Sequence, residues 1–137
     1  HHDHDTDLSV CIDNLKPFVG KYEMIKDYSY NAYSRFPDEY FDFVYIDGNH
    51  SYDAVKDDLI KWYPKLKKGG LIAGDDYSKF SEEKLFNYSF GVKRAVDEFA
   101  FEQKKNVSID LTGEWYYSTV VNGLDVLYFS RNWYFFK

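Results

Sequence analysis

The chain has 137 residues, of which 45% are apolar and 21% aromatic. That length suits one domain with one hydrophobic core, and the apolar content excludes an intrinsically disordered chain. A formal net charge of −6 argues against nucleic acid as a partner. No run of 18 apolar residues occurs, which argues against a membrane-spanning helix and a membrane partner.

Hydrophobic periodicity predicts alternating helices and strands along the chain. Helices are expected over about 7–18, 30–36, 51–66 and 91–103. Strands are expected at 22–25, 41–46, 71–73, 107–111, 115–117, 125–130 and 133–136.

Two of these elements indicate the fold class. The strand at 41–46 is almost continuously apolar, as expected for a strand covered on both faces. The helix that follows places Val55, Leu59 and Leu66 on one face, and strand–helix–strand alternation predicts parallel pairing. We therefore expect a single α/β domain over 1–137. It has an open, mostly parallel sheet, helices on both faces and an antiparallel C-terminal end.

Carboxylates follow two strands that are expected to be neighbours. Asp47 comes after the strand at 41–46, and Asp75 and Asp76 come after the strand at 71–73. Parallel strands end at the same sheet edge, so the three side chains should converge there, where Mg²⁺ or Ca²⁺ would offset their repulsion. The alternative is separate roles in a helix cap and a turn. Adjacent residues of an extended chain also point in opposite directions.

His50 follows Asp47 by three residues, at the start of the helix expected over 51–66. An imidazole with a pKa near neutrality suits a general base. The alternative is a histidine that only hydrogen-bonds to the backbone at a helix start. The residues alone favour neither interpretation.

Three stretches resemble a known family. They read FDFVYIDGNHSY at 41–52, GGLIAGDDY at 69–77 and GVKRAVDEF at 91–99. Together they resemble class I S-adenosylmethionine-dependent methyltransferases. The resemblance is to the small O-methyltransferase family of the methyltransferase-24 type, which includes sugar and macrolide-sugar methyltransferases.

The resemblance implies a Rossmann-like fold, S-adenosylmethionine as cofactor, and O-methylation of a sugar or similar small molecule. It implies Mg²⁺ held by Asp47, Asp75 and Asp76. It also implies His50 as the base that removes the hydroxyl proton, with Asp47 as the other candidate base. The implied cofactor contacts are Asp27, Tyr28, Ser29 and Asp47.

The chain departs from the family at its N-terminal end. None of its eight glycines forms the Gly-rich loop that approaches the cofactor, and nothing before residue 21 reads as two strands and a helix. We therefore expect the N-terminal strands of the domain to be missing, with exposed strand edges that favour a homo-oligomer. The alternative function is a non-catalytic binding or interaction domain derived from a methyltransferase. A metal-dependent hydrolase is a third, weaker alternative.

The single cysteine, Cys11, excludes an internal disulfide. No signal-peptide core or other targeting segment is visible at the start of the sequence. A cytoplasmic location is therefore expected.

Overall fold

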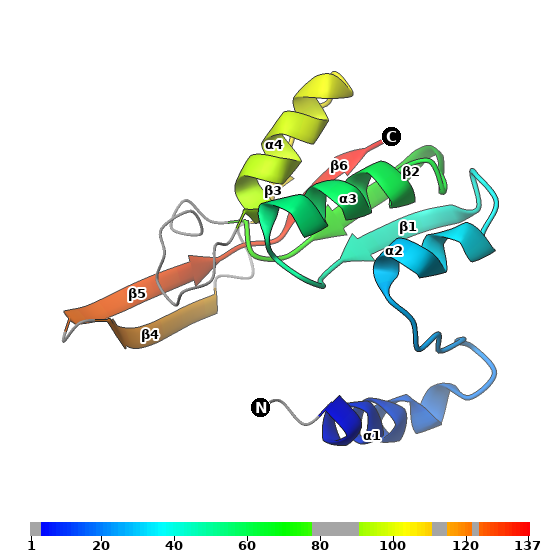
Figure 1. The fold of residues 1–137 in the computed structure, drawn as a ribbon, viewed down its shortest axis with the longest axis horizontal. Coiled ribbons are helices and arrows are strands. Elements are labelled where there is room, and N and C mark those ends of the chain that lie inside the picture. The colour runs from blue at the N-terminus through cyan, green and yellow to red at the C-terminus, as the bar shows by residue number, and fades with distance from the viewer. Residues whose placement is uncertain (1–3, 78–90, 111–114, 122–123) are drawn as a thin grey trace.

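The computed structural model describes residues 4–77, 91–110, 115–121 and 124–137 (Figure 1). Its helical segments are α1 (His4–Leu15), η1 (Lys16–Phe18), α2 (Ser29–Ala32), η2 (Tyr33–Arg35), α3 (Tyr52–Trp62) and α4 (Val92–Glu102). Its strands are β1 (Phe41–Ile46), β2 (Leu66–Gly74), β3 (Ser108–Ile109), β4 (Trp115–Val121), β5 (Leu124–Ser130) and β6 (Trp133–Phe136).

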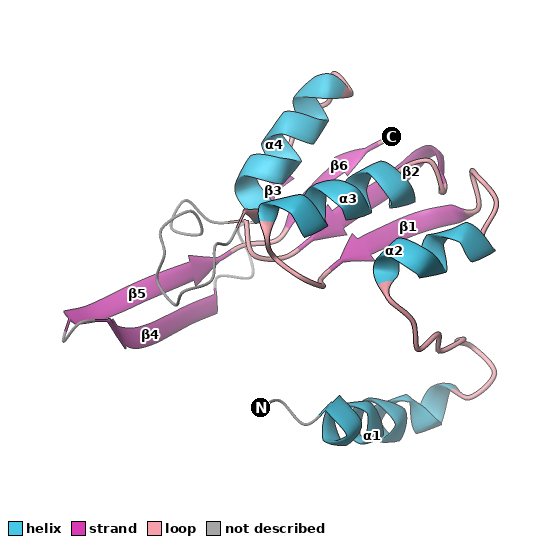
Figure 2. Ribbon diagram, in the orientation of Figure 1, coloured by secondary structure: helices cyan, strands magenta, loops and turns pink. Residues whose placement is uncertain are grey.

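The main sheet has the strand order β1-β2-β6-β3. Strands β1 and β2 are parallel, and α3 makes the connection between them; β6 runs antiparallel to both β2 and β3. Strands β4 and β5 form a separate antiparallel pair. The expected open α/β sheet with an antiparallel C-terminal strand is confirmed (Figure 2).

The hydrophobic core lies between this sheet and helices α3 and α4, which pack against each other. From α3 it takes Val55 and Leu59, and from α4 it takes Val96 and Phe99. These are the apolar positions that the helical spacing places on one face of each helix. Trp133 of β6, which is fully buried, completes the core from the sheet side.

The helix and strand on either side of Pro64 differ from the sequence expectation. Helix α3 ends at Trp62, because Pro64 has no N–H group to continue the helical hydrogen bonding. Strand β2 then begins at Leu66 instead of 71 and pairs with Phe41 across a register shift in β1. The β1–β2 pairing is therefore longer than the apolar run at 71–73 suggests.

The strand predicted at 22–25 is wrong, because these residues form an irregular segment between η1 and α2. A short strand needs a neighbour to receive its backbone hydrogen bonds, and within the described part of the chain none lies beside this segment. Tyr22 and Met24 are 39% and 38% exposed.

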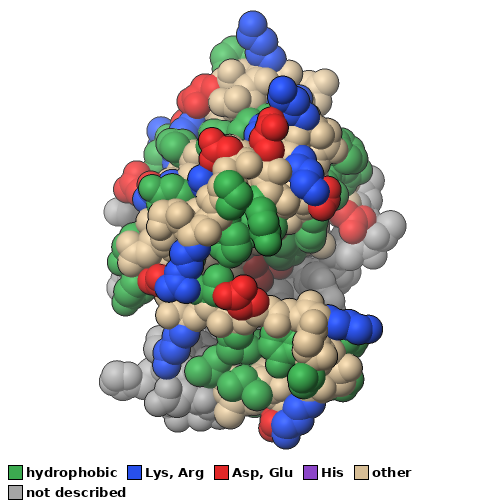
Figure 3. Space-filling view, turned by 90° about the vertical axis from the view of Figure 1, so that its right-hand side faces the viewer, with side chains coloured by type: hydrophobic (Ala, Val, Ile, Leu, Met, Phe, Trp, Pro, Cys, Tyr) green, Lys and Arg blue, Asp and Glu red, His purple; other side chains and the backbone are tan. Residues whose placement is uncertain are grey.

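The other face of the sheet carries aromatic side chains at the surface. Phe43 and Tyr45 of β1 and Phe136 of β6 are each about half exposed. The view in Figure 3 likewise shows apolar side chains reaching the surface among charged ones. Among the described residues, no helix is long and apolar enough to cross a membrane.

Candidate active site

The carboxyl ends of β1 and β2 lie side by side. Ile46 is in register with Gly74, so Asp47 and Asp75 leave the sheet at the same edge. The close approach requires glycine at 74, since a Cβ there would lie 2.5 Å from the carbonyl oxygen of Ile46 and 2.6 Å from the Trp133 ring. The pairing that the sequence predicted therefore brings the aspartates together.

Asp76 has a left-handed backbone conformation, with φ of 59°. Its N–H donates to Oδ1 of Asp75 at 2.7 Å, at the bend directly after β2. Aspartate tolerates this conformation better than most residues. The turn ends the alternation of an extended strand, so Asp75 and Asp76 need not point to opposite faces.

His50 lies between two carboxylates. Its Nδ1 is 2.7 Å from Oδ2 of Asp76, and its Nε2 is 3.2 Å from Oδ1 of Asp47. The hydrogen bond with Asp76 is the main cause that raises the pKa of His50 above 6.5, opposed by burial and supported by Asp47. Because a carboxylate only accepts, Nδ1 carries a proton in this arrangement. His50 is thus more than a helix-start residue bonded to backbone.

The Tyr45 hydroxyl group gives further evidence that the three aspartates lie close together. It donates to Oδ1 of Asn132 at 2.6 Å. Burial raises its pKa, and the charges of Asp75, Asp47 and Asp76 raise it further. All three aspartates therefore lie near one hydroxyl group at the edge of the sheet.

The loop that carries His50 is held by helix α4. The N–H of Gly91 donates to the carbonyl oxygen of His50 at 2.8 Å. A Cβ at Gly91 would overlap the backbone of Tyr52, so the first turn of α4 can approach this loop only with glycine there. The sequence predicted Gly91 as the first residue of the helix over 91–103, whereas it precedes α4 and no role was predicted for it.

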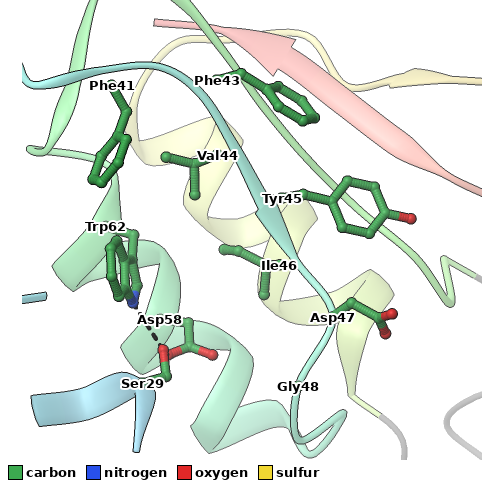
Figure 4. A pocket seen from close by; sticks show the side chains of 10 residues that line it. All are labelled: Ser29, Phe41, Phe43, Val44, Tyr45, Ile46, Asp47, Gly48, Asp58 and Trp62. Carbon is green, nitrogen blue, oxygen red and sulfur yellow. Dashed lines mark hydrogen bonds between the residues drawn. The ribbon is translucent and has the colours of Figure 1, made fainter. Parts of the chain in front are cut away.

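Two of the predicted cofactor contacts, Ser29 and Asp47, line a common cavity of about 340 Å³ along β1. Ser29 donates to Oδ1 of Asp58 at 2.5 Å and accepts from Nε1 of Trp62 at 2.8 Å. Figure 4 shows Asp47 on the far side of β1 from this Ser29 group. Ser29 and Asp47 therefore line the same cavity from opposite sides of β1.

The other two predicted cofactor contacts, Asp27 and Tyr28, come directly before α2 in the sequence. Asp27 accepts from the Tyr28 N–H at 2.8 Å and pairs with Arg35 at 3.2 Å. Tyr28 is 68% exposed and stacks on Tyr30, with ring centroids 5.1 Å apart. An exposed, stacked pair of rings is available to a flat ligand, whereas Asp27 has both oxygens engaged.

The three aspartates offer the carboxylate oxygens that a divalent cation binds, but in their present arrangement these oxygens contact other groups. Asp47 and Asp76 both contact His50, and Asp75 accepts the Asp76 N–H. Across the ranges that the structure describes, no group of three or more His, Cys, Asp or Glu side chains is arranged to hold a metal ion. His50 occupies the position between two of the expected ligands.

Residues 2–77, more than half of the chain, match the model of a family described as a methyltransferase domain. The chain belongs to this methyltransferase family. No curated protein sequence matches it. The matched range contains the whole His50–Asp47–Asp76 cluster and ends at Tyr77, so the methyltransferase domain includes the candidate site.

Solved structures support the same fold for this methyltransferase domain. Precorrin-6y C5,15-methyltransferase from Geobacter metallireducens matches with a TM-score of 0.62 and 17% identity, over 95% of this chain and 61% of that one. Precorrin 8w decarboxylase from Methanobacterium thermoautotrophicum gives 0.61 and 14%, over 94% and 63%. A SAM-dependent methyltransferase from Archaeoglobus fulgidus gives 0.59 and 16%, over 91% and 72%. The chain thus spans less than two thirds of the first two structures.

Proposed function

We propose that this methyltransferase domain transfers the methyl group of S-adenosylmethionine to a hydroxyl of a small molecule, with sugars as the substrate class. Family membership supports the methyl donor. The hydrogen bond between His50 and Asp76 supports the hydroxyl acceptor. A hydroxyl must lose its proton as its oxygen attacks the methyl carbon, so the reaction needs a base beside the acceptor.

The two carboxylates give His50 that role. Asp76 accepts from Nδ1–H, which fixes the imidazole and leaves Nε2 as the atom that takes a proton. Nε2 is 3.2 Å from Oδ1 of Asp47, so an acceptor hydroxyl would have to replace Asp47 as the partner of Nε2. It would then pass its proton to the unprotonated Nε2 as the oxygen–methyl bond forms and the methyl–sulfur bond breaks. With His50 as the base, Asp47 would stabilise the imidazolium that results. In the alternative, Asp47 is the base and takes the proton itself.

The proposal includes a Mg²⁺ ion at the site. Asp47, Asp75 and Asp76 would supply its oxygen ligands, and the bound cation would lower the pKa of a coordinated hydroxyl. Binding would require Asp47 and Asp76 to release His50, because both contact it. Adding MgCl₂ should therefore lower the pKa of His50, measured by NMR. A pKa unchanged by saturating MgCl₂ would remove the metal from the proposal.

The function is tested by mixing the chain with S-adenosylmethionine that carries a labelled methyl group and with panels of sugars, catechols and carboxylates. The assay measures the label on the acceptor and the release of S-adenosylhomocysteine. We expect transfer to sugars, and a rate lower by about 10²-fold or more in His50→Gln. Asp53→Asn, an exposed charge on the same helix as Tyr52, is the matched control. A transfer rate in His50→Gln equal to that of the native chain would exclude His50 as the base. Absence of transfer with every acceptor would favour the non-catalytic binding domain.

A further inference from the structure

Helix α4 carries two ion pairs at consecutive positions. Lys93 pairs with Asp97, and Nε of Arg94 lies 3.0 Å from Oε1 of Glu98, so each pair spans four positions of the helix. Side chains at this spacing are neighbours on a helix surface, and opposite charges hold each other in place there. These four residues have no part in the proton transfer proposed above.

The first ion pair holds Tyr77, which directly follows Asp76 in the chain. The Tyr77 hydroxyl donates to Oδ1 of Asp97 at 2.5 Å, and Nζ of Lys93 lies over the Tyr77 ring, 5.1 Å from its centre. A hydrogen bond to a charged acceptor is stronger than a neutral one, and a cation over an aromatic face adds attraction. Because Tyr77 and Asp76 share a peptide bond, a fixed Tyr77 ring restricts where the Asp76 carboxylate can lie.

The second ion pair holds Tyr52, two residues after His50. The Tyr52 hydroxyl donates to Oε2 of Glu98 at 2.5 Å, and Cζ of Arg94 lies 4.4 Å from the centre of the Tyr52 ring. The N–H of Gly91 holds the same loop through its hydrogen bond to the carbonyl oxygen of His50. The loop after β1 is therefore joined to the first half of α4 at two points.

These contacts bear on a distance that the proposed reaction needs. Nδ1 of His50 lies 2.7 Å from Asp76, whereas Nε2 lies 3.2 Å from Asp47. The two carboxylates compete for the one ring proton of a neutral His50, and the shorter hydrogen bond favours Nδ1. An outward shift of Asp76 by about 0.5 Å would make the two distances equal. Nε2 would then carry the proton in part of the molecules and could not accept one from a substrate.

We infer that α4 positions the proposed base and its partner carboxylate relative to each other. Asp97 holds the turn after β2 through Tyr77. Glu98 holds the loop after β1 through Tyr52. The two acids are adjacent in the helix, so one rigid segment sets the place of both loops. Each acts through a tyrosine and is a positioning residue. The inference rests on the proposed function of His50, but the geometry can be measured without substrate.

The experiment compares Tyr77→Phe and Tyr52→Phe with the native chain. Each variant removes one hydroxyl group and keeps a ring that packs against the core. The chemical shifts of the His50 ring nitrogens, read by NMR through its carbon-bound protons at a pH where the ring is neutral, show which nitrogen carries the proton. We expect Nδ1–H to predominate in the native chain and to lose that predominance in both variants. Tyr63→Phe is the matched control, because this ring also packs on α4, 5.3 Å from the Phe99 ring.

Methyl transfer provides a second measurement. Both variants should lower kcat by about tenfold and leave KM for S-adenosylmethionine within about twofold, because a misplaced base slows the chemical step and not cofactor binding. The native position of the ring proton in either folded variant would overturn the inference. So would an equal change in Tyr63→Phe, since the effect would then belong to packing in general. Absence of transfer in the native chain would contradict the proposed function alone, and the position of the ring proton would still decide the positioning role.

Discussion

Nδ1 of His50 lies 2.7 Å from Oδ2 of Asp76, which joins the loop after β1 to the turn after β2. The contact depends on the register that aligns Ile46 with Gly74 and on the left-handed backbone at Asp76. Two adjacent parallel strands thus bring together an imidazole and a carboxylate that lie 26 positions apart in the chain. The site is a product of the sheet and not of one local motif.

The pKa of His50 should lie above 6.5 and should fall in Asp76→Asn, because the hydrogen bond with Asp76 is the main cause of its rise. Asparagine also tolerates a positive φ, so this variant removes the charge without straining the turn. Titration of the His50 ring by NMR measures both values. The same pKa in the two proteins would show that Asp76 does not hold the ring in solution.

The contribution of His50 to stability should depend on pH. Its folded-state pKa is raised above the unfolded value, so its protonated form stabilises the fold fully below about pH 6.5 and the benefit is lost as pH rises through the folded pKa. The difference in unfolding free energy between the native chain and His50→Gln should therefore be largest in mild acid and smaller above the folded pKa. Urea unfolding across this range measures it, and a difference that grows with pH would contradict the assignment.

Gly91→Ala should destabilise the fold by about 1–3 kcal/mol, because the added methyl group overlaps the backbone of Tyr52. The substitution should also loosen the loop of His50, which Gly91 holds through its N–H. Gly48→Ala is the control, since its nearest neighbour would be at 3.9 Å. Urea midpoints measure both, and an equal effect of the two substitutions would argue against the close packing of α4 on this loop.

Leu59→Ala should cost about 2–5 kcal/mol, because Leu59 is fully buried between α3, α4 and the sheet. Ile60, the next residue on the same helix, is 53% exposed, and Ile60→Ala should cost less than about 1 kcal/mol. Comparing the two substitutions separates the effect of burial on stability from the effect of helix propensity. Similar costs in thermal or urea unfolding would mean that α3 packs with a different face.

The sequence predicted the parts of the site that depend on strand ends. A nearly continuous apolar run at 41–46 and a second at 71–73 predicted adjacent strands, and Asp47, Asp75 and Asp76 do meet at their common edge. Helical periodicity predicted the buried faces of α3 and α4 for the same reason. These features arise from local patterns that a single sequence displays.

Other features arise from contacts between distant residues. No pattern marks Asn132 as the partner of Tyr45, or Ser29 as the partner of buried Asp58, because each pair forms only after the sheet and helices have packed. The residues at 22–25 have strand-like composition, but a strand also requires a neighbour, and composition does not supply one. The positive φ of Asp76 is likewise imposed by the turn and not by its residue type.

The proposed cofactor is tested most directly by calorimetric titration of the folded chain with S-adenosylhomocysteine, with and without MgCl₂. The account predicts saturable binding at about micromolar concentration that Ser29→Ala and Asp47→Asn weaken, since both residues line the cavity along β1. No saturable heat from a folded chain would contradict the account and leave this methyltransferase domain without its proposed cofactor.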